Sequence, residues 1–329
     1  MGKLKKIKIG NIEIKNNIFL APMSGVTDLP FRSIVKKFSP GLVYSEMIAS
    51  RALIEKNRKT LKMLKKNNNE LLAVQIAGCD PKVMAYAAKV CEEEGADIID
   101  INMGCPVKKV TNGWAGSALM KDENLATKII YSTKKSVKIP VTLKMRTGWN
   151  DSMRNAPKIA KVAEDIGISL ITVHGRTRCQ MYRGRSDWRF IKNVKNQIKI
   201  PLIANGDVLD CSDANKILKD SGADGFMIGR GTYGKPWIFS EIINFFKEKS
   251  LYNIKSFDIK EIILEHLDLN LSHYDTTVGV RNFRKHLSWY SKSFDNSNLF
   301  RSKVNTITEY RVLKRIINEF FDDGKRKYS

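Results

Sequence analysis

Apolar and β-branched residues recur in short runs between residues 18 and 228, and each run is followed by a segment whose apolar positions have helical spacing. Several of these segments have clear helix ends, such as Asp80 before Pro81 at one start and Gly167 at one end. Eight strand–helix units in about 240 residues predict an α/β fold of the (β/α)8 TIM-barrel type. The strand-like runs are 18–22, 42–45, 71–76, 98–102, 141–145, 170–174, 201–204 and 225–228.

The pattern changes near residue 241. From there the apolar spacing is helical throughout, no strand-like run occurs, and Lys, Arg and aromatic residues are frequent. We therefore predict two domains, a barrel over residues 1–240 and an all-helical domain over residues 241–329.

A doubly wound open sheet is the structural alternative, because it also alternates strands and helices. The segment 229–234, GlyArgGlyThrTyrGly, matches the dinucleotide-binding pattern and follows a strand-like run. That fingerprint requires another parallel strand with an acidic residue at its end, whereas only helical sequence follows here. In a barrel, the same glycines let backbone N–H groups approach a phosphate.

The charge balance is strongly basic, with 57 Lys and Arg against 34 Asp and Glu and a formal net charge of +23. Such a charge favours a polyanionic partner such as nucleic acid. The excess of Lys over Arg is also what an A/T-rich genome produces. Charge alone is therefore only a weak indication of that partner.

The five cysteines form no Cys-x-x-Cys pair, and their odd number leaves any disulfide scheme incomplete, which fits a reducing compartment. The basic N-terminal residues precede no apolar stretch long enough for a signal peptide, and no run approaches the length of a membrane span. We expect a soluble, cytoplasmic protein.

One cysteine lies in an unusual position. The buried-strand pattern at 98–102 runs directly into Gly104, Cys105 and Pro106, so the thiol is presented at a strand end between a flexible and a rigid residue. A reactive thiol would be presented in this way, although free cysteines are also common in protein cores.

In barrel enzymes the active site lies at the carboxyl ends of the strands. Each residue found there has a structural explanation when taken alone: Lys144 as a solvated side chain, His174 as a satisfied buried histidine, and 205–207 as a turn. Functional residue types at all eight ends together predict an active site. They are Met23, Glu46, Gln75, Asn102 with Cys105, Lys144 with Arg146, His174 with Arg176, Asn205 with Asp207, and Gly229 with Arg230.

These residues also indicate a ligand. Backbone amides near Gly206, Gly229 and Arg230 can hold a terminal phosphate at the usual barrel position. Lys144 can balance negative charge on a reduced flavin ring, and Gln75 offers a donor and an acceptor to the ring's amide edge. The cofactor indicated is FMN.

With these motifs in place, the chain resembles the tRNA-dihydrouridine synthases, and among them the bacterial DusB-like branch. The likeness spans the barrel and continues into the helical region at 284–290. One departure is AsnGlyTrp at 112–114, where basic or small residues are expected in the catalytic loop. The matching segments are 21–32, 74–78, 99–106, 115–120, 143–149, 174–178, 203–207 and 227–230.

The resemblance implies Cys105 as proton donor, NADPH as reductant and a uridine of tRNA as substrate, with position 17 suggested by the branch. We further expect a monomer that binds neither metal nor membrane. The implied FMN contacts are Pro22, Met23, Ser24, Gln75, Lys144, His174, Asn205, Gly206, Asp207, Gly229 and Arg230. The expected substrate contacts are Asn102, Arg146, Arg176, Arg178, Arg281 and Arg284.

The chemistry agrees with these assignments. Hydride delivered to uracil C6 leaves carbanion character at C5, and a protonated thiol nearby can supply the missing proton. A stacked uracil cannot reach the barrel mouth, so the base must be flipped out and the RNA held elsewhere. The arginine-rich loop at 176–189 offers phosphate contacts, with Tyr182 and Trp188 as possible stacking surfaces.

Three other functions remain open. A small-molecule FMN oxidoreductase of the dihydroorotate dehydrogenase type shares the barrel, but it explains neither the arginine loop nor the helical tail. An RNA-binding protein whose barrel has lost its chemistry would not need Cys105. A flavin-dependent RNA uridine methyltransferase on the same scaffold differs only in its product.

Overall fold

The computed structural model describes residues 3–55, 57–68, 70–248 and 256–323. Their contacts divide the chain into two compact units. The first contains Met1–Asp28 and Pro40–Gly229, and the second contains Leu29–Ser39 and Arg230–Ser329. Residues 249–255 and 324–329 of the predicted second domain lie outside the described residues. The predicted boundary at residue 240 stays a prediction.

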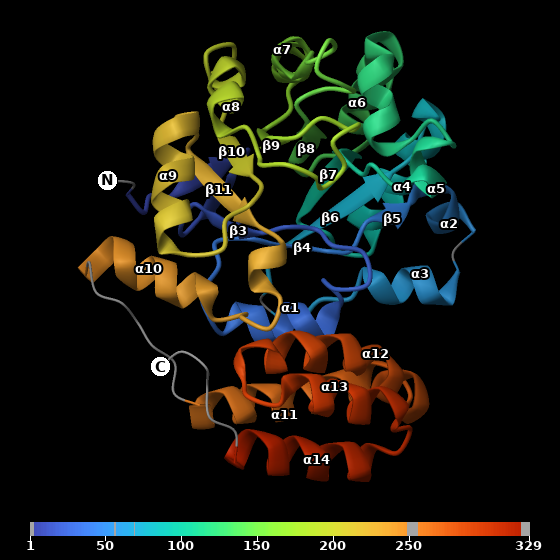
Figure 1. Ribbon diagram of the computed structural model, residues 1–329. Coiled ribbons are helices and arrows are strands. Elements are labelled where there is room, and N and C mark those ends of the chain that lie inside the picture. The colour runs from blue at the N-terminus through green and yellow to red at the C-terminus, as the bar shows by residue number, and fades with distance from the viewer. Residues whose placement is uncertain (1–2, 56, 69, 249–255, 324–329) are drawn as a thin grey trace. The chain divides into compact units, whose positions relative to one another are not determined.

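The first unit is built around a parallel barrel, as predicted (Figure 1). The strands lie in the order β3-β11-β10-β9-β8-β7-β6-β4, and a parallel bridge between Phe19 and Leu42 joins the two ends of the series. This arrangement excludes the doubly wound alternative. The eight strands, which match the eight predicted runs, are β3 (Ile18–Leu20), β4 (Val43–Tyr44), β6 (Leu72–Ala77), β7 (Ile98–Met103), β8 (Val141–Arg146), β9 (Leu170–His174), β10 (Leu202–Asn205) and β11 (Gly225–Ile228).

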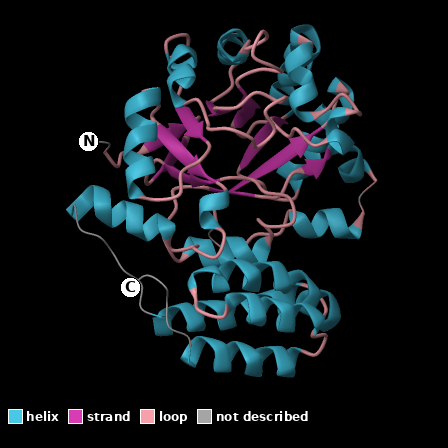
Figure 2. Cartoon of the chain, in the orientation of Figure 1, coloured by secondary structure: helices cyan, strands magenta, loops and turns pink. Residues whose placement is uncertain are grey.

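Helices surround these strands, so that the strands form the inner layer (Figure 2). The Asp80 side chain accepts hydrogen bonds from the Lys82 and Val83 amides at the start of α4, and Gly167 ends α7 in a left-handed conformation. The helices are α2 (Ser50–Ile54), α3 (Arg58–Met63), α4 (Pro81–Glu93), α5 (Lys108–Thr111), η1 (Gly116–Lys121), α6 (Glu123–Ser136), α7 (Ala156–Ile166), α8 (Trp188–Lys195) and α9 (Cys211–Ser221). Three short strands complete the unit: β5 (Ile48–Ala49) pairs with β6, and β1 (Ile7–Ile9) with β2 (Ile12–Ile14).

Polar side chains occupy the barrel interior at β7 and β8. The Lys144 Nζ of β8 reaches the Asn205 Oδ1 of β10 at 3.1 Å, past the intervening strand β9, which is possible only inside the barrel. Alternate residues of a strand face the same side, so Asp100 and Asn102 of β7 face inward together, as do Thr142 and Lys144 of β8. A polar interior is unusual for this fold, because branched apolar side chains commonly fill it.

The second unit is helical throughout its described part, as predicted. Its helix α1 comes from the first forty residues and packs on the tail helices, where the Phe31 ring lies 5.7 Å from the His266 ring and 5.5 Å from the His286 ring. In the described ranges, no helix is both long enough and apolar enough to cross a membrane. The helices are α1 (Leu29–Lys36), η2 (Arg230–Thr232), α10 (Ile238–Glu248), α11 (Ser256–His273), α12 (Thr276–Tyr290), η3 (Ser291–Ser293), α13 (Ser297–Thr306) and α14 (Tyr310–Asp323).

Candidate active site

The turn after β7 holds the Cys105 backbone on both sides. The Asn102 Oδ1 accepts hydrogen bonds from the Gly104 amide at 3.0 Å and the Cys105 amide at 2.9 Å. The Ser117 hydroxyl donates to the Cys105 carbonyl at 2.8 Å. Gly116 has a φ of 61°, and a Cβ there would lie 2.8 Å from that carbonyl, so the close approach requires glycine. Cys105 itself is partly exposed and its thiol is free.

Behind this turn lies a buried chain of polar side chains. The Gln75 Nε2 donates to the Asp100 carboxylate at 2.7 Å, and the Asn102 Nδ2 donates to the Gln75 Oε1 at 2.7 Å. The Thr142 hydroxyl donates to the other Asp100 oxygen at 2.6 Å. Burial raises the pKa of Asp100 to about 6, while these hydrogen bonds and the charge of Lys144 act in the opposite direction.

Lys144 is a buried cation at the same end of the barrel. Burial lowers the pKa of its ammonium group to about 8, and the negative charge of Asp100 opposes that shift. Its side chain donates to Asn205, a neutral acceptor, whose Nδ2 in turn donates to the Met227 carbonyl at 2.8 Å. A lysine so placed can offer a positive charge to an anionic ligand at the strand ends.

Arg146 and Arg176 were both expected to contact substrate, and the structure places both guanidinium groups inside the protein. Arg146 is 1% exposed and donates to the carbonyls of Gly104, Thr177 and Met181 at 2.7–2.8 Å. It therefore links the Cys105 turn to the loop after β9. Substrate contact by either arginine stays a prediction.

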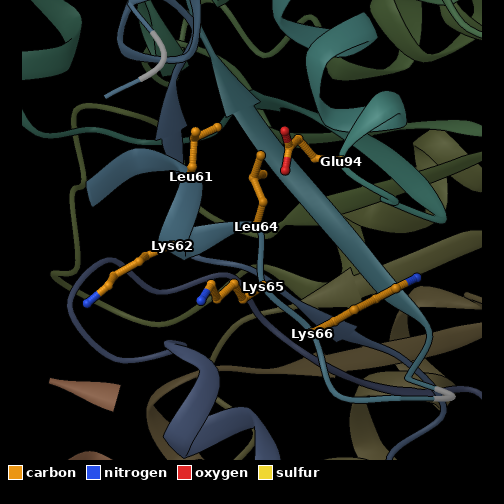
Figure 3. Close-up of a pocket in the computed structure, with 6 residues that line it drawn as sticks. All are labelled: Leu61, Lys62, Leu64, Lys65, Lys66 and Glu94. Carbon is orange, nitrogen blue, oxygen red and sulfur yellow. The ribbon is translucent and has the colours of Figure 1, made fainter. Parts of the chain in front are cut away.

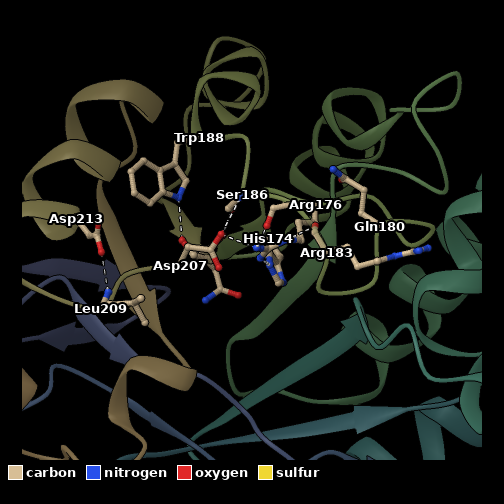
Figure 4. A network of polar contacts seen from close by, with 12 residues as sticks. His174, Arg176, Gln180, Arg183, Ser186, Trp188, Asp207, Leu209 and Asp213 are labelled. Carbon is tan, nitrogen blue, oxygen red and sulfur yellow. Dashed lines mark hydrogen bonds and ion pairs between the residues drawn. The ribbon is translucent and has the colours of Figure 1, made fainter. Parts of the chain in front are cut away.

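Arg176 stabilises the turn after β10 through an ion pair (Figure 4). Its Nη2 forms an ion pair with Asp207 at 2.5 Å, and its Nη1 lies 3.1 Å from the His174 Nε2. An arginine only donates, so the His174 Nε2 is the acceptor and the Nδ1 carries the ring proton. The Ser186 amide donates to Asp207 at 2.8 Å.

The Gly206 backbone is fixed by the same turn. The Trp188 indole N–H donates to the Gly206 carbonyl at 2.8 Å, so the polar end of this tryptophan is bound within the protein (Figure 4). Gly206 has a φ of 120°, and a Cβ there would lie 2.4 Å from the Ser186 hydroxyl. Only glycine fits this position.

The other predicted residues fall into two groups. Pro22, Met23 and Gly229 lie together, since a Cβ at Gly229 would meet Ala21 and Met23 at 3.6 Å, and Ser24 follows on an exposed turn. Arg230, Arg281 and Arg284 belong to the second unit. There, Arg230 and Arg281 are exposed, whereas the half-buried Arg284 donates to the Ile307 carbonyl.

A set of aromatic and basic side chains lies near the Cys105 turn, and of its four members the sequence predicted a contact only for Arg178. Trp114 is 53% exposed and has a positive φ of 56°. The Lys121 ammonium lies 5.8 Å from the Trp114 ring and 4.4 Å from the Trp149 ring, and the Arg178 guanidinium lies 4.6 Å from Trp149. We call these four residues the Trp114 array.

A separate pocket of about 380 Å³ lies on the first unit and contains none of the strand-end residues (Figure 3). Its mixed lining does not resemble the candidate site. It is lined by Leu61, Lys62, Leu64, Lys65, Lys66 and Glu94. Within the described ranges, no group of three or more His, Cys, Asp or Glu side chains is placed to hold a metal ion.

Comparison with known proteins gives the family of this chain. The family model described as "Dihydrouridine synthase (Dus)" matches residues 19–323. The chain belongs to the dihydrouridine synthase family. The matched region includes the Cys105 turn, the buried Lys144 and the helices of the second unit up to residue 323. All candidate site residues of this synthase-family chain therefore lie within the match.

Curated relatives are similar to this chain over almost their whole length. A "Probable tRNA-dihydrouridine synthase" from Rickettsia conorii (strain ATCC VR-613 / Malish 7) is 52% identical over 320 residues, covering 96% of each chain. A "tRNA-dihydrouridine synthase B" from Pseudomonas syringae pv. tomato (strain ATCC BAA-871 / DC3000) is 42% identical over 323 residues, covering 98% of this chain and 96% of the relative. These relatives support the predicted membership of this synthase family.

A solved structure shows the same fold at much lower identity. Histamine dehydrogenase from Rhizobium sp. 4-9 superposes with a TM-score of 0.59 at 13% identity, covering 80% of this chain and 50% of that one. At this identity the likeness concerns the fold of this dihydrouridine synthase and not its chemistry.

Proposed function

We propose that this protein reduces the C5–C6 double bond of a uridine in tRNA to 5,6-dihydrouridine, with FMN as cofactor and NADPH as reductant. The observation that carries the proposal is the arrangement of a partly exposed, backbone-fixed Cys105 and a buried Lys144 at the same end of the barrel. Membership of the family supports it. We also propose a cytoplasmic monomer.

The residues present fit FMN. Lys144 is a buried cation that donates to a neutral acceptor, so an anionic ring beside it would be stabilised. Gly206 and Gly229 directly follow β10 and β11, and barrels usually bind phosphate at these strand ends. We propose Pro22, Met23, Ser24, Gln75, Lys144, His174, Asn205, Gly206, Asp207, Gly229 and Arg230 as the residues that hold the cofactor.

Bound FMN would supply a hydride to C6 of the uracil. Cys105 then donates its thiol proton to C5, so that one hydride and one proton saturate the double bond. Asn102 keeps the thiol in place through the Cys105 amide, and the buried Arg146 holds the Gly104 carbonyl. We propose that the flipped base lies over this turn.

The array beside the turn is suited to RNA. Exposed Trp114 offers a stacking surface, and Lys121 and Arg178 supply positive charge. Arg178 also donates to the Thr111 hydroxyl at 3.4 Å, which links the array to α5, the short helix that follows the Cys105 turn. We propose that Trp114 stacks on a base next to the flipped uridine.

Replacing Trp114 with alanine is expected to raise the KM for tRNA about tenfold and to leave flavin content unchanged, because one stacked base contributes about 1–3 kcal/mol. Trp114→Phe should recover most of the affinity. The exposed Tyr131 on α6 provides the matched control as Tyr131→Ala. Equal KM values for wild type and Trp114→Ala would exclude stacking at this position.

For the second unit we propose a docking role, carried by exposed Arg281 on α12. Arg281→Glu should weaken tRNA binding and flatten its salt dependence, since a lost phosphate contact releases fewer counterions. Filter binding across a salt series measures both. Arg315→Glu on α14 is the control, because Arg315 is also exposed but already pairs with Glu319. An unchanged salt slope in Arg281→Glu would contradict the role.

The proposed function is tested by incubating the purified, FMN-loaded protein with NADPH and unmodified tRNA. Dihydrouridine is then mapped by mass spectrometry, with position 17 as the expected site. A methylated uridine would favour the methyltransferase alternative. A flavin-loaded protein that leaves every uridine unchanged would contradict the proposal.

A further inference from the structure

Asp100 is a buried carboxylate that the proposed chemistry does not use. It lies in the interior of β7 and is 0% exposed, two residues before Asn102 and five before Cys105. Its two oxygens accept hydrogen bonds from Gln75 and Thr142 at 2.7 and 2.6 Å. A carboxylate costs free energy when buried, so its presence in this largely apolar, fully buried strand needs a reason.

The hydrogen bonds that connect Asp100 through Gln75 and Asn102 to the Cys105 turn can form with only one arrangement of donors and acceptors. An ionised carboxylate can only accept, so the amide of Gln75 must turn its NH2 group toward Asp100 and its oxygen toward Asn102. Asn102 must then turn its NH2 group toward Gln75, which leaves its oxygen for the backbone amides of the Cys105 turn. Those amides can only donate. Both ends of the chain therefore require the same orientation of the two side-chain amides.

We propose that Asp100 is a positioning residue: by setting the orientation of Gln75 and Asn102, its carboxylate holds the turn that presents the Cys105 thiol. The inference rests on the proposed function, because the position of the thiol matters only if Cys105 is the proton donor. The hydrogen bonds of Asp100 go to Gln75 and Thr142, and its effect on the turn passes through Gln75 and Asn102.

Charge is the competing explanation for Asp100. Two titratable groups interact with its charge: Lys144 on the neighbouring strand β8, and Tyr44 on β4, which β6 separates from β7. Burial raises the pKa of Tyr44 and lowers that of Lys144, and the negative charge of Asp100 adds to the first shift and opposes the second. If Asp100 only kept Lys144 charged, any neutral replacement would have the same effect. If it positions the turn, a neutral replacement that still accepts a hydrogen bond would suffice.

Two variants separate these explanations. Asp100→Asn is neutral, but its oxygen can accept from Gln75 while its NH2 group faces Thr142, whose hydroxyl has the Ile99 carbonyl at 3.5 Å as another acceptor. Asp100→Leu has a similar shape and accepts nothing, so the Gln75 amide loses its fixed partner. Dihydrouridine formation is measured for both, together with flavin content.

A second readout does not depend on activity. Peptide-resolved alkylation with iodoacetamide follows the rate at the Cys105 thiol, and the exposed Cys179 serves as an internal reference within each sample. In Asp100→Leu we expect kcat to fall about tenfold, the KM for tRNA to stay within about twofold, and the Cys105 rate to change about threefold or more relative to Cys179. Asp100→Asn should stay within about threefold of wild type on each measure.

Equal losses in both variants would overturn the inference in favour of a charge effect on Lys144. Wild-type kcat and wild-type alkylation in Asp100→Leu would overturn it outright. Should the leucine variant not retain flavin, Asp100→Ser replaces it, because the shorter hydroxyl cannot reach the Gln75 amide, and the same results are required. A wild-type protein that forms no dihydrouridine would instead contradict the proposed function, while the alkylation rates would still report on the turn.

Discussion

Cys105→Ala is expected to lower the turnover of tRNA about 100-fold or more while leaving the affinities for FMN and tRNA nearly unchanged. The change removes the proton donor, and general acid catalysis commonly contributes about 10²–10⁴-fold. It removes no binding contact, because the turn is held through the backbone by Asn102 and Ser117. Single-turnover measurements at saturating tRNA would report the loss in the chemical step itself.

Cys179→Ala is the matched control, because Cys179 is a free, exposed thiol in the loop after β9. It should have wild-type turnover. If Cys105→Ala reduced tRNA as fast as this control, the thiol would have no role in proton transfer.

The second large effect is expected for Lys144→Met, which keeps the length of the side chain and removes its charge. We expect FMN to bind about tenfold more weakly or worse, and its reduction by NADPH to slow, because the negative charge of the reduced ring would lose a buried cation. Lys161→Met removes a surface lysine that pairs with Glu164 and Asp165 and should change neither quantity. Equal FMN affinity in the two variants would contradict the assignment.

The same lysine gives a pH dependence with a definite sign. Burial lowers the pKa of Lys144 to about 8, so the ammonium charge is present below this pH and is lost above it. The affinity of the apoprotein for FMN should therefore fall as the pH rises through about 8. Quenching of flavin fluorescence on binding measures this affinity. In Lys144→Met this decline should be absent.

Much of the fold was predictable because the relevant signals are local. The eight β-branched runs all became barrel strands, and the helix ends at Asp80 and Gly167 both formed as expected. The turn after β7 was also predictable, since Gly104 permits a sharp change of backbone direction and Pro106 cannot continue the pairing of the strand.

The partners of the buried arginines could not be predicted. Arg146 and Arg176 lie at strand ends like the functional residues, but their guanidinium groups are taken up by carbonyls and by Asp207 in loops distant in sequence. A position at a strand end fixes where a side chain begins and does not fix where a long side chain ends. By contrast, the sequence does indicate Asp100, because a charged residue within a largely apolar strand predicts a buried carboxylate with hydrogen-bond partners.

Helix α1 has a consequence for the synthesis of this protein. Its buried residues Phe31, Ile34 and Val35 are made early, whereas the helices they pack with in the second unit begin only at residue 256. During translation the apolar side of α1 must therefore stay without its final neighbours until nearly the whole chain has left the ribosome. The last helices thus complete a part of the molecule that begins near the N-terminus, and a premature stop in the tail would leave an early segment open to aggregation.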